Sequence, residues 1–128
     1  MSTILIIEDE KMLADMYKEK LEMEGFQVDL AFSSEQGIDY LKEKTPAIIL
    51  LDILLPGDNG IEFLKKIKQV PNLENIPIIA FSNYDDPVTK KEAFSLGVKD
   101  YLIKANYVPN KVVERIRGFL ALKNKKTR

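Results

Sequence analysis

The stretch from residue 48 to residue 60, with the sequence IILLDILLPGDNG, constrains the fold of this chain more than any other. Four apolar residues run into Asp52, three more follow, and Pro56 with the next four residues ends the pattern. A short apolar run bounded by turn residues predicts a strand that is buried on both faces, as in a parallel sheet. Asp52 then lies at the carboxyl end of that strand, where open α/β sheets place their ligands. A carboxylate in such an apolar setting is costly, so a partner for Asp52 must lie nearby.

Strands and helices are predicted to alternate along the chain. The expected strands cover residues 3–7, 26–31, 47–51, 77–81 and 100–103. Helices are predicted over residues 12–24 and after the capping residues Ser33, Asn59 and Asp86, and a last one begins near Pro109. In the first helix, a buried stripe is expected at Leu13, Met16, Tyr17 and Leu21.

This alternation is typical of right-handed βαβ units. It predicts an α/β fold: a doubly wound, five-stranded parallel sheet in the order 2-1-3-4-5, covered on both faces by five helices. With 128 residues, a single domain over residues 1–128 is expected. Its core covers residues 3–122, and the basic segment KNKKTR, residues 123–128, is expected to be a frayed tail.

Composition excludes several classes of site. The chain has no cysteine and no histidine, so thiolate and imidazole chemistry are absent and any metal site must be built from oxygen ligands. The net charge of −1 gives no reason to expect a nucleic-acid or membrane partner. No apolar run approaches the ~20 residues that span a bilayer, so a cytoplasmic protein is expected.

The predicted strand ends carry the polar residues that a site requires. The first strand ends at Glu8 and Asp9, the third at Asp52, the fourth at Ser82 and the fifth at Lys104. Three carboxylates and one ammonium leave a charge of about −2, which a divalent cation such as Mg²⁺ neutralises. A hydroxyl and an ammonium beside that metal complete a phosphoryl cradle. The chemistry this permits is attack of the Asp52 carboxylate on phosphorus to give an aspartyl phosphate.

These residues resemble the receiver domain of two-component response regulators, a flavodoxin-like fold related to the chemotaxis receiver. The similarity rests on the acidic pair Glu8 and Asp9, the D-x-x-x-P-G-x-x-G run of residues 52–60, Ser82 after an apolar strand, and D-Y-L-I-K over residues 100–104. Each motif alone is weak, but all four in this order are specific. The similarity covers about residues 3–122.

The resemblance implies a signalling switch in a phosphorelay, not an enzyme with a substrate of its own. Asp52 accepts a phosphoryl group from a sensor histidine kinase or a phosphotransfer protein. Asp9, Asp52 and the backbone carbonyl of Leu54 hold Mg²⁺, and Glu8 acts through water. Lys104 and Ser82 contact the phosphoryl group.

It also implies a way of signalling. Ser82 moves to the phosphoryl group, and Tyr101 turns inward into the space that is left. The fourth helix, fifth strand and fifth helix then present a changed surface to a downstream protein effector. A stand-alone receiver is expected, either monomeric or forming a weak phosphorylation-dependent dimer.

The sequence departs from the family pattern beside the site. Ala105 follows Lys104 where the family usually has proline in a cis peptide, and a non-proline cis bond costs ~3 kcal/mol. A trans or strained loop is therefore expected, and the direction of Lys104 stays open. Asn83 stands where a small residue is common. Leu54 and Tyr84 hold positions that tune dephosphorylation in this family, and their bulk predicts slow water access and a long-lived phosphoryl state.

Other functions for this fold remain as alternatives. The leading one is a pseudo-receiver, a binding module that is not phosphorylated because the Ala105 loop misplaces Lys104. A flavin-binding protein of the same topology needs a phosphate loop after the first strand, where the three acids at residues 8–10 repel phosphate. A phosphatase with an aspartate nucleophile places that residue after the first strand and not the third.

Overall fold

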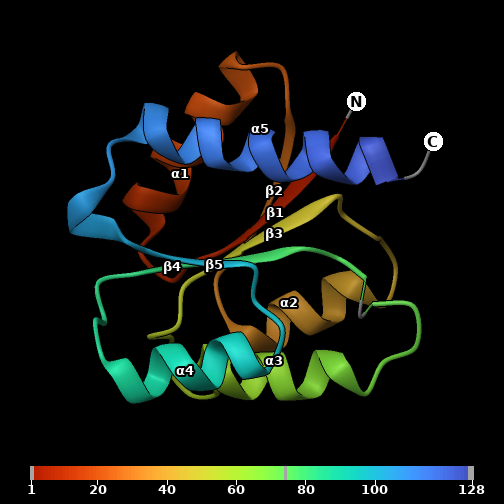
Figure 1. Ribbon diagram of the computed structural model, residues 1–128, viewed down its shortest axis with the longest axis vertical. Coiled ribbons are helices and arrows are strands. Elements are labelled where there is room, and N and C mark those ends of the chain that lie inside the picture. The colour runs from red at the N-terminus through yellow and green to blue at the C-terminus, as the bar shows by residue number, and fades with distance from the viewer. Residues whose placement is uncertain (1, 74, 127–128) are drawn as a thin grey trace.

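The computed structural model describes residues 2–73 and 75–126 as one parallel α/β sheet with its covering helices (Figure 1). The strands pair in the order β2-β1-β3-β4-β5, and every pairing is parallel. This confirms the predicted doubly wound fold. The strands are β1 (Thr3–Ile7), β2 (Gln27–Ala31), β3 (Ile48–Leu51), β4 (Ile78–Ser82) and β5 (Asp100–Ile103).

Five α-helices alternate with these strands, as predicted from the sequence: four connect successive strands and the fifth follows β5. They are α1 (Lys11–Met23), α2 (Ser34–Leu41), α3 (Gly60–Lys68), α4 (Pro87–Ser95) and α5 (Pro109–Lys126). A short 3-10 helix, η1 (Lys104–Asn106), which was not predicted, joins β5 to α5.

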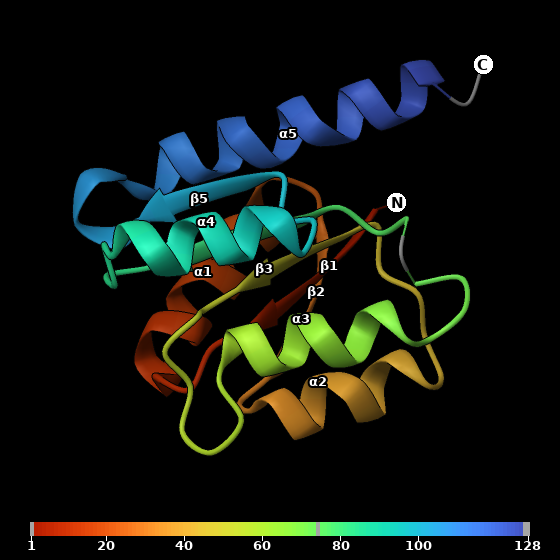
Figure 2. The ribbon, with the colours of Figure 1, turned by 60° about the horizontal axis from the view of Figure 1, so that its bottom comes forward.

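The helices form two layers around the sheet. Figures 1 and 2 show α1 and α5 on one face, with α2, α3 and α4 on the other. Each layer has its own core, because strands buried on both faces send alternate side chains to opposite sides. In β1, Ile4 and Ile6 join the cluster under α1 and α5, whereas Leu5 and Ile7 join the cluster under the other three helices.

Local side-chain signals set the helix starts. The Oγ atom of Ser33 accepts a hydrogen bond from the Gln36 backbone N–H at 3.1 Å, which is the first half of the predicted capping box. The returning bond differs from that prediction, because Oε1 of Gln36 accepts from the N–H of Phe32, the residue before the cap, and not from the Ser33 N–H. Asn59 caps α3 and Asp86 caps α4 in the same way, also as predicted. These caps fix where the loops at the carboxyl edge of the sheet end.

One prediction about the surface was wrong. Met16 was expected in the core, but its side chain is 43% exposed, and Ala14 is buried in α1 together with Tyr17 and Leu21. The buried face of α1 is therefore narrower than the spacing of its apolar residues indicates. The frayed tail over residues 123–128 stays a prediction: α5 continues as far as Lys126, and the last two residues lie outside the described part of the chain.

Candidate functional site

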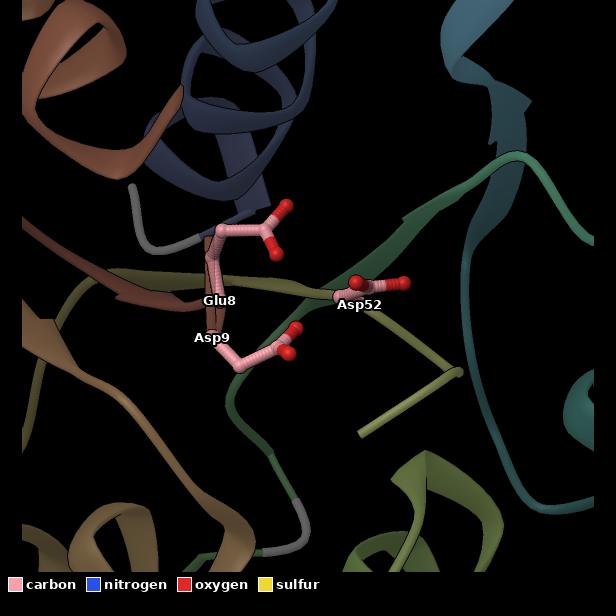
Figure 3. A group of neighbouring side chains, drawn as sticks. All are labelled: Glu8, Asp9 and Asp52. Atoms are coloured by element: carbon pink, nitrogen blue, oxygen red, sulfur yellow. The ribbon is translucent and has the colours of Figure 1, made fainter. Parts of the chain in front are cut away.

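Three carboxylates meet at the carboxyl edge of the sheet. β1 and β3 are neighbours with Ile7 paired to Leu51, so the residues that follow them, Glu8 and Asp52, lie side by side. Carboxylate oxygens of Glu8, Asp9 and Asp52 lie within 4.8 Å of one another (Figure 3). Glu8 is 3% and Asp52 6% exposed, whereas Asp9 is open to solvent. The cluster is therefore buried on one side and accessible on the other.

Lys104 is the cation that accompanies this cluster. It follows β5 and reaches across β4, so that its Nζ atom lies 3.2 Å from Oδ2 of Asp52 and also pairs with Oε1 of Glu8. The Lys104 side chain is itself largely buried. One ammonium cannot neutralise three carboxylates, so the cluster retains an excess of negative charge.

The electrostatic setting shifts the titration of this pair. Burial raises the pKa of Glu8 to about 7; the hydrogen bond from Lys104 opposes this rise and the charge of Asp52 adds to it. For Lys104, burial lowers the pKa, but the hydrogen bond to Glu8 and the charge of Asp52 outweigh burial and leave the pKa raised. The ammonium is thus held in its charged form.

The loop after β3 holds Asp52 in place. The Asp52 N–H donates to the carbonyl of Ile7 at 2.9 Å, and Oδ1 of Asp52 accepts from the Leu54 N–H at 3.2 Å. Gly60 closes the loop, because its N–H donates to the Ile53 carbonyl at 2.8 Å. A Cβ atom at Gly60 would lie 2.7 Å from the Ile53 Cα, so only glycine allows this approach.

Ser82 and Tyr101 lie on the β4–β5 side of the site. Ser82 is fully buried at the end of β4, and its Oγ accepts from the Tyr84 N–H at 3.2 Å. Tyr101 is 8% exposed, and its hydroxyl donates to the Tyr84 carbonyl at 2.7 Å. Burial raises the pKa of Tyr101 to about 12, and the nearby charges, Asp52 first, add to the rise. Tyr101 thus occupies the inward position that the resemblance associates with the switched state.

The residues that depart from the family pattern form a defined loop. Among the described residues there is no cis peptide bond, so Lys104 and Ala105 are joined in trans. The Ala105 N–H donates to Oδ1 of Asn83 at 3.0 Å, which ties the β5–α5 connection to the end of β4. With this tie, the Lys104 ammonium reaches Asp52 without the proline.

Leu54 and Tyr84 each follow a site residue by two positions, Asp52 and Ser82. Both side chains are exposed, and they line a cleft of about 370 Å³ between the β3–α3 loop and α4. The slow water access and long-lived phosphoryl state expected from their bulk stay a prediction.

Sequence reasoning missed two contributors to the site. The ring of Phe81 lies 5.8 Å from the Lys104 ammonium, and Tyr17 packs edge-on against Phe81 at 5.2 Å between centroids. The Phe81 ring thus makes a cation–π contact with the Lys104 ammonium, and Tyr17 packs against that ring. Apolar residues carry no signal for such a role, because they also fit an ordinary core. The contact of Lys104 with Glu8 was missed for a similar reason: it joins residues 96 positions apart.

The donor set fits a hard divalent cation. All three candidate side chains offer carboxylate oxygens, two of them are buried, and one lysine leaves excess negative charge. Asp9 and Asp52 present these oxygens toward the same region (Figure 3). The part of the chain that the structure describes contains no helix that could cross a membrane.

A doubly wound five-stranded sheet with an acidic cluster and a lysine at its carboxyl edge defines the receiver class of flavodoxin-like folds. The family model for the response regulator receiver domain matches residues 4–117. The chain belongs to this family, the receiver domains of two-component systems.

Relatives and solved structures agree with this assignment. The chain is 35% identical to the transcriptional regulatory protein CpxR of Escherichia coli over 120 residues and 31% identical to the phosphate regulon regulator PhoB of Rhizobium meliloti over 117. These matches cover 94% and 91% of the chain, which spans about half the length of either relative. A CheY-like receiver domain from Methanospirillum hungatei superimposes with a TM-score of 0.90 at 27% identity, covering 98% of both chains.

Proposed function

We propose that Asp52 is the phosphoacceptor of a signalling switch. The observation that carries this proposal is the position of Asp52: a buried carboxylate at the end of β3, within reach of two other acids and 3.2 Å from the Lys104 ammonium. An acid that only caps a helix or lies on the surface requires neither two neighbouring acids nor a paired lysine. The donor is a phosphohistidine on a sensor histidine kinase or a phosphotransfer protein.

The transfer is a substitution at phosphorus. An oxygen of Asp52 forms the new O–P bond while the N–P bond of the phosphohistidine breaks, and the imidazole keeps the electron pair and takes up a proton. Lys104 stabilises the negative charge that spreads over the phosphoryl oxygens, because its ammonium already faces Oδ2 of Asp52. Ser82 supplies a hydroxyl at the neighbouring strand end.

Mg²⁺ is the proposed cofactor. Asp9, Asp52 and the Leu54 carbonyl hold the ion, and Glu8 contributes through water. When bound, Mg²⁺ offsets the charge of the cluster and of the incoming phosphoryl oxygens. Glu8 has a second role that the resemblance does not include, because it pairs with Lys104 and so holds the ammonium beside Asp52.

The output is a change of surface. Ser82 moves to the phosphoryl group and Tyr101 turns inward into the space that is left. The face formed by α4, β5 and α5 then presents a changed surface to a downstream protein effector. The protein catalyses only its own phosphorylation and dephosphorylation. It acts in the cytoplasm, as a monomer or as a weak dimer that depends on phosphorylation.

Intact-mass measurement with acetyl phosphate and Mg²⁺ tests the proposal. We expect the chain to gain one phosphoryl mass, and hydroxylamine to remove it, because hydroxylamine cleaves acyl phosphates. Asp52→Asn abolishes the gain. Asp58→Asn, which changes an exposed acid of the same loop that pairs with Lys66, is the matched control and keeps it.

A folded protein that gains no phosphoryl mass would contradict the proposal and leave the pseudo-receiver, a binding module of the same fold. The position of Lys104 speaks against that alternative, because the lysine is not misplaced by Ala105.

A further inference from the structure

The inward position of Tyr101 is held from more than one side. Its ring belongs to the core cluster beneath α2, α3 and α4, which includes the small side chains Ala80 and Ala93. Its hydroxyl donates to the carbonyl of Tyr84 in the β4–α4 loop. The loop and the ring are therefore coupled, since a ring that swings outward loses this hydrogen bond.

Lys90 adds a contact that the phosphoacceptor chemistry does not need. It lies in the second turn of α4, and its Nζ atom is 5.8 Å from the centre of the Tyr101 ring. The same ammonium pairs with Asp85 in the β4–α4 loop. The Lys90 side chain is 34% exposed, so it is partly desolvated, a setting that strengthens a cation–π contact. Lys90 thus connects the loop, the helix and the switch residue.

Helix α4 is held to the rest of the protein by few buried residues, so the contact between Lys90 and Tyr101 has a large influence on its position. Of the nine residues of α4, all of them described, Ala93 alone is buried. A helix with so little buried surface keeps its position through few contacts, and it belongs to the less stable part of a fold. Losing one contact to the sheet therefore shifts its position more than it would for α3, which buries five residues.

We propose that Lys90 is a positioning residue for Tyr101. Held by Asp85, its ammonium stabilises the ring in the buried position and thereby keeps the β4–α4 loop in the arrangement seen here. The effect on signalling rests on the proposed function, in which the inward position accompanies phosphorylation. The effect on the ring itself does not depend on that function.

The test compares the effect of removing the charge of Lys90 with the effect of removing the charge of Lys91. Lys90→Met removes the ammonium and keeps the length of the side chain, Lys90→Arg keeps a cation, and Lys91→Met removes an exposed charge from the same helix turn. Relaxation-dispersion NMR on protein with labelled tyrosine rings measures the population in which Tyr101 leaves its buried position. Tyr101→Phe assigns the signal.

We expect Lys90→Met to raise that population about two- to fivefold, the range that one cation–π contact supports. Lys90→Arg restores the wild-type population, and Lys91→Met leaves it unchanged. An unchanged population in Lys90→Met, an equal rise in Lys91→Met, or no rescue by arginine would overturn the proposal. The ring populations of all three variants are measured on unphosphorylated protein. The result therefore does not depend on whether Asp52 accepts a phosphoryl group.

A second measurement links the ring to the site. If Tyr101 and Asp52 are coupled, phosphorylation by acetyl phosphate lowers the population in which Tyr101 leaves its buried position, since a ligand shifts an equilibrium by its differential affinity for the two states. A ring population that rises in Lys90→Met but does not respond to phosphorylation would retain the positioning role and reject the coupling to phosphorylation.

Discussion

The Nζ atom of Lys104 lies 3.2 Å from Oδ2 of Asp52 and pairs at the same time with Glu8. This double contact crosses the sheet from β5 to β3 and β1. The shared ammonium compensates the charge of both buried carboxylates. Without it, each would be a buried charge with no partner, which is strongly destabilising. Four predictions follow from this geometry and its surroundings.

Lys104→Met should separate metal binding from phosphorylation. We expect phosphorylation by acetyl phosphate to slow by roughly 10²-fold, the usual cost of losing one group that stabilises transition-state charge. Mg²⁺ should bind more tightly, because the cluster loses its one accompanying cation. Mass spectrometry gives the rate and calorimetry the affinity. Lys99→Met, an exposed lysine, is the control. Wild-type rates in Lys104→Met would show that the ammonium has no part in the transfer.

Asp9→Asn should weaken Mg²⁺ binding with little effect on stability. The side chain is exposed, so its loss leaves no buried charge unpaired. We expect at least a tenfold loss of affinity, about the smallest cost of disturbing a metal site. Calorimetric titration with Mg²⁺ measures the loss, and chelation of Mg²⁺ from the wild type should stop phosphorylation in the same assay. An unaltered affinity in Asp9→Asn would place the ion elsewhere.

Alkaline pH should destabilise the protein partly through Tyr101. The folded pKa of about 12 exceeds the ordinary value of 10.0, so the folded state holds this proton more tightly than the unfolded state. The stabilisation is complete below pH 10 and is lost as the pH rises toward 12. By about pH 11 the loss from this residue is about 1 kcal/mol.

Urea unfolding of the wild type and of Tyr101→Phe, each at about pH 8 and about pH 11, isolates this contribution. The other tyrosines with raised pKa values, Tyr17 and Tyr40, are present in both proteins and cancel in the comparison. Tyr101→Phe should lose less stability between the two pH values. Equal losses would mean that Tyr101 ionises as freely in the folded protein as in the unfolded chain.

Gly60→Ala and Gly118→Ala should change stability in opposite directions. A Cβ atom at Gly60 meets the Ile53 Cα at 2.7 Å and the Asp52 carbonyl at 2.9 Å, so we expect a loss of about 1–3 kcal/mol and a displaced Asp52. A Cβ atom at Gly118, in α5, meets nothing within 4 Å, so alanine there should add about 0.5–1 kcal/mol. Thermal unfolding measures both. A Gly60→Ala protein as stable as the wild type would mean that the β3–α3 loop is not closely packed.

The helices and strands could be predicted from the sequence, because the signals that specify them are local. The caps at Ser33, Asn59 and Asp86 act within three residues, and the unbroken apolar runs identify strands that must be buried on both faces. Alternation of strands and helices indicates a doubly wound sheet, for which five strands suit the order 2-1-3-4-5. The structure has this order, which brings Glu8, Asp9 and Asp52 to one edge. The acidic cluster could be predicted for this reason.

Contacts between residues that are far apart in the sequence could not be predicted, because they depend on how the elements pack. Lys104 contacts Glu8 through the side-by-side packing of strands, and Tyr101 is seated by Tyr84 and Lys90, which no periodicity predicts. Met16 is apolar and correctly spaced, yet the way α1 lies on the sheet leaves it exposed. Apolar spacing shows that a helix has a buried face, but only the packed sheet and its neighbours define how wide that face is.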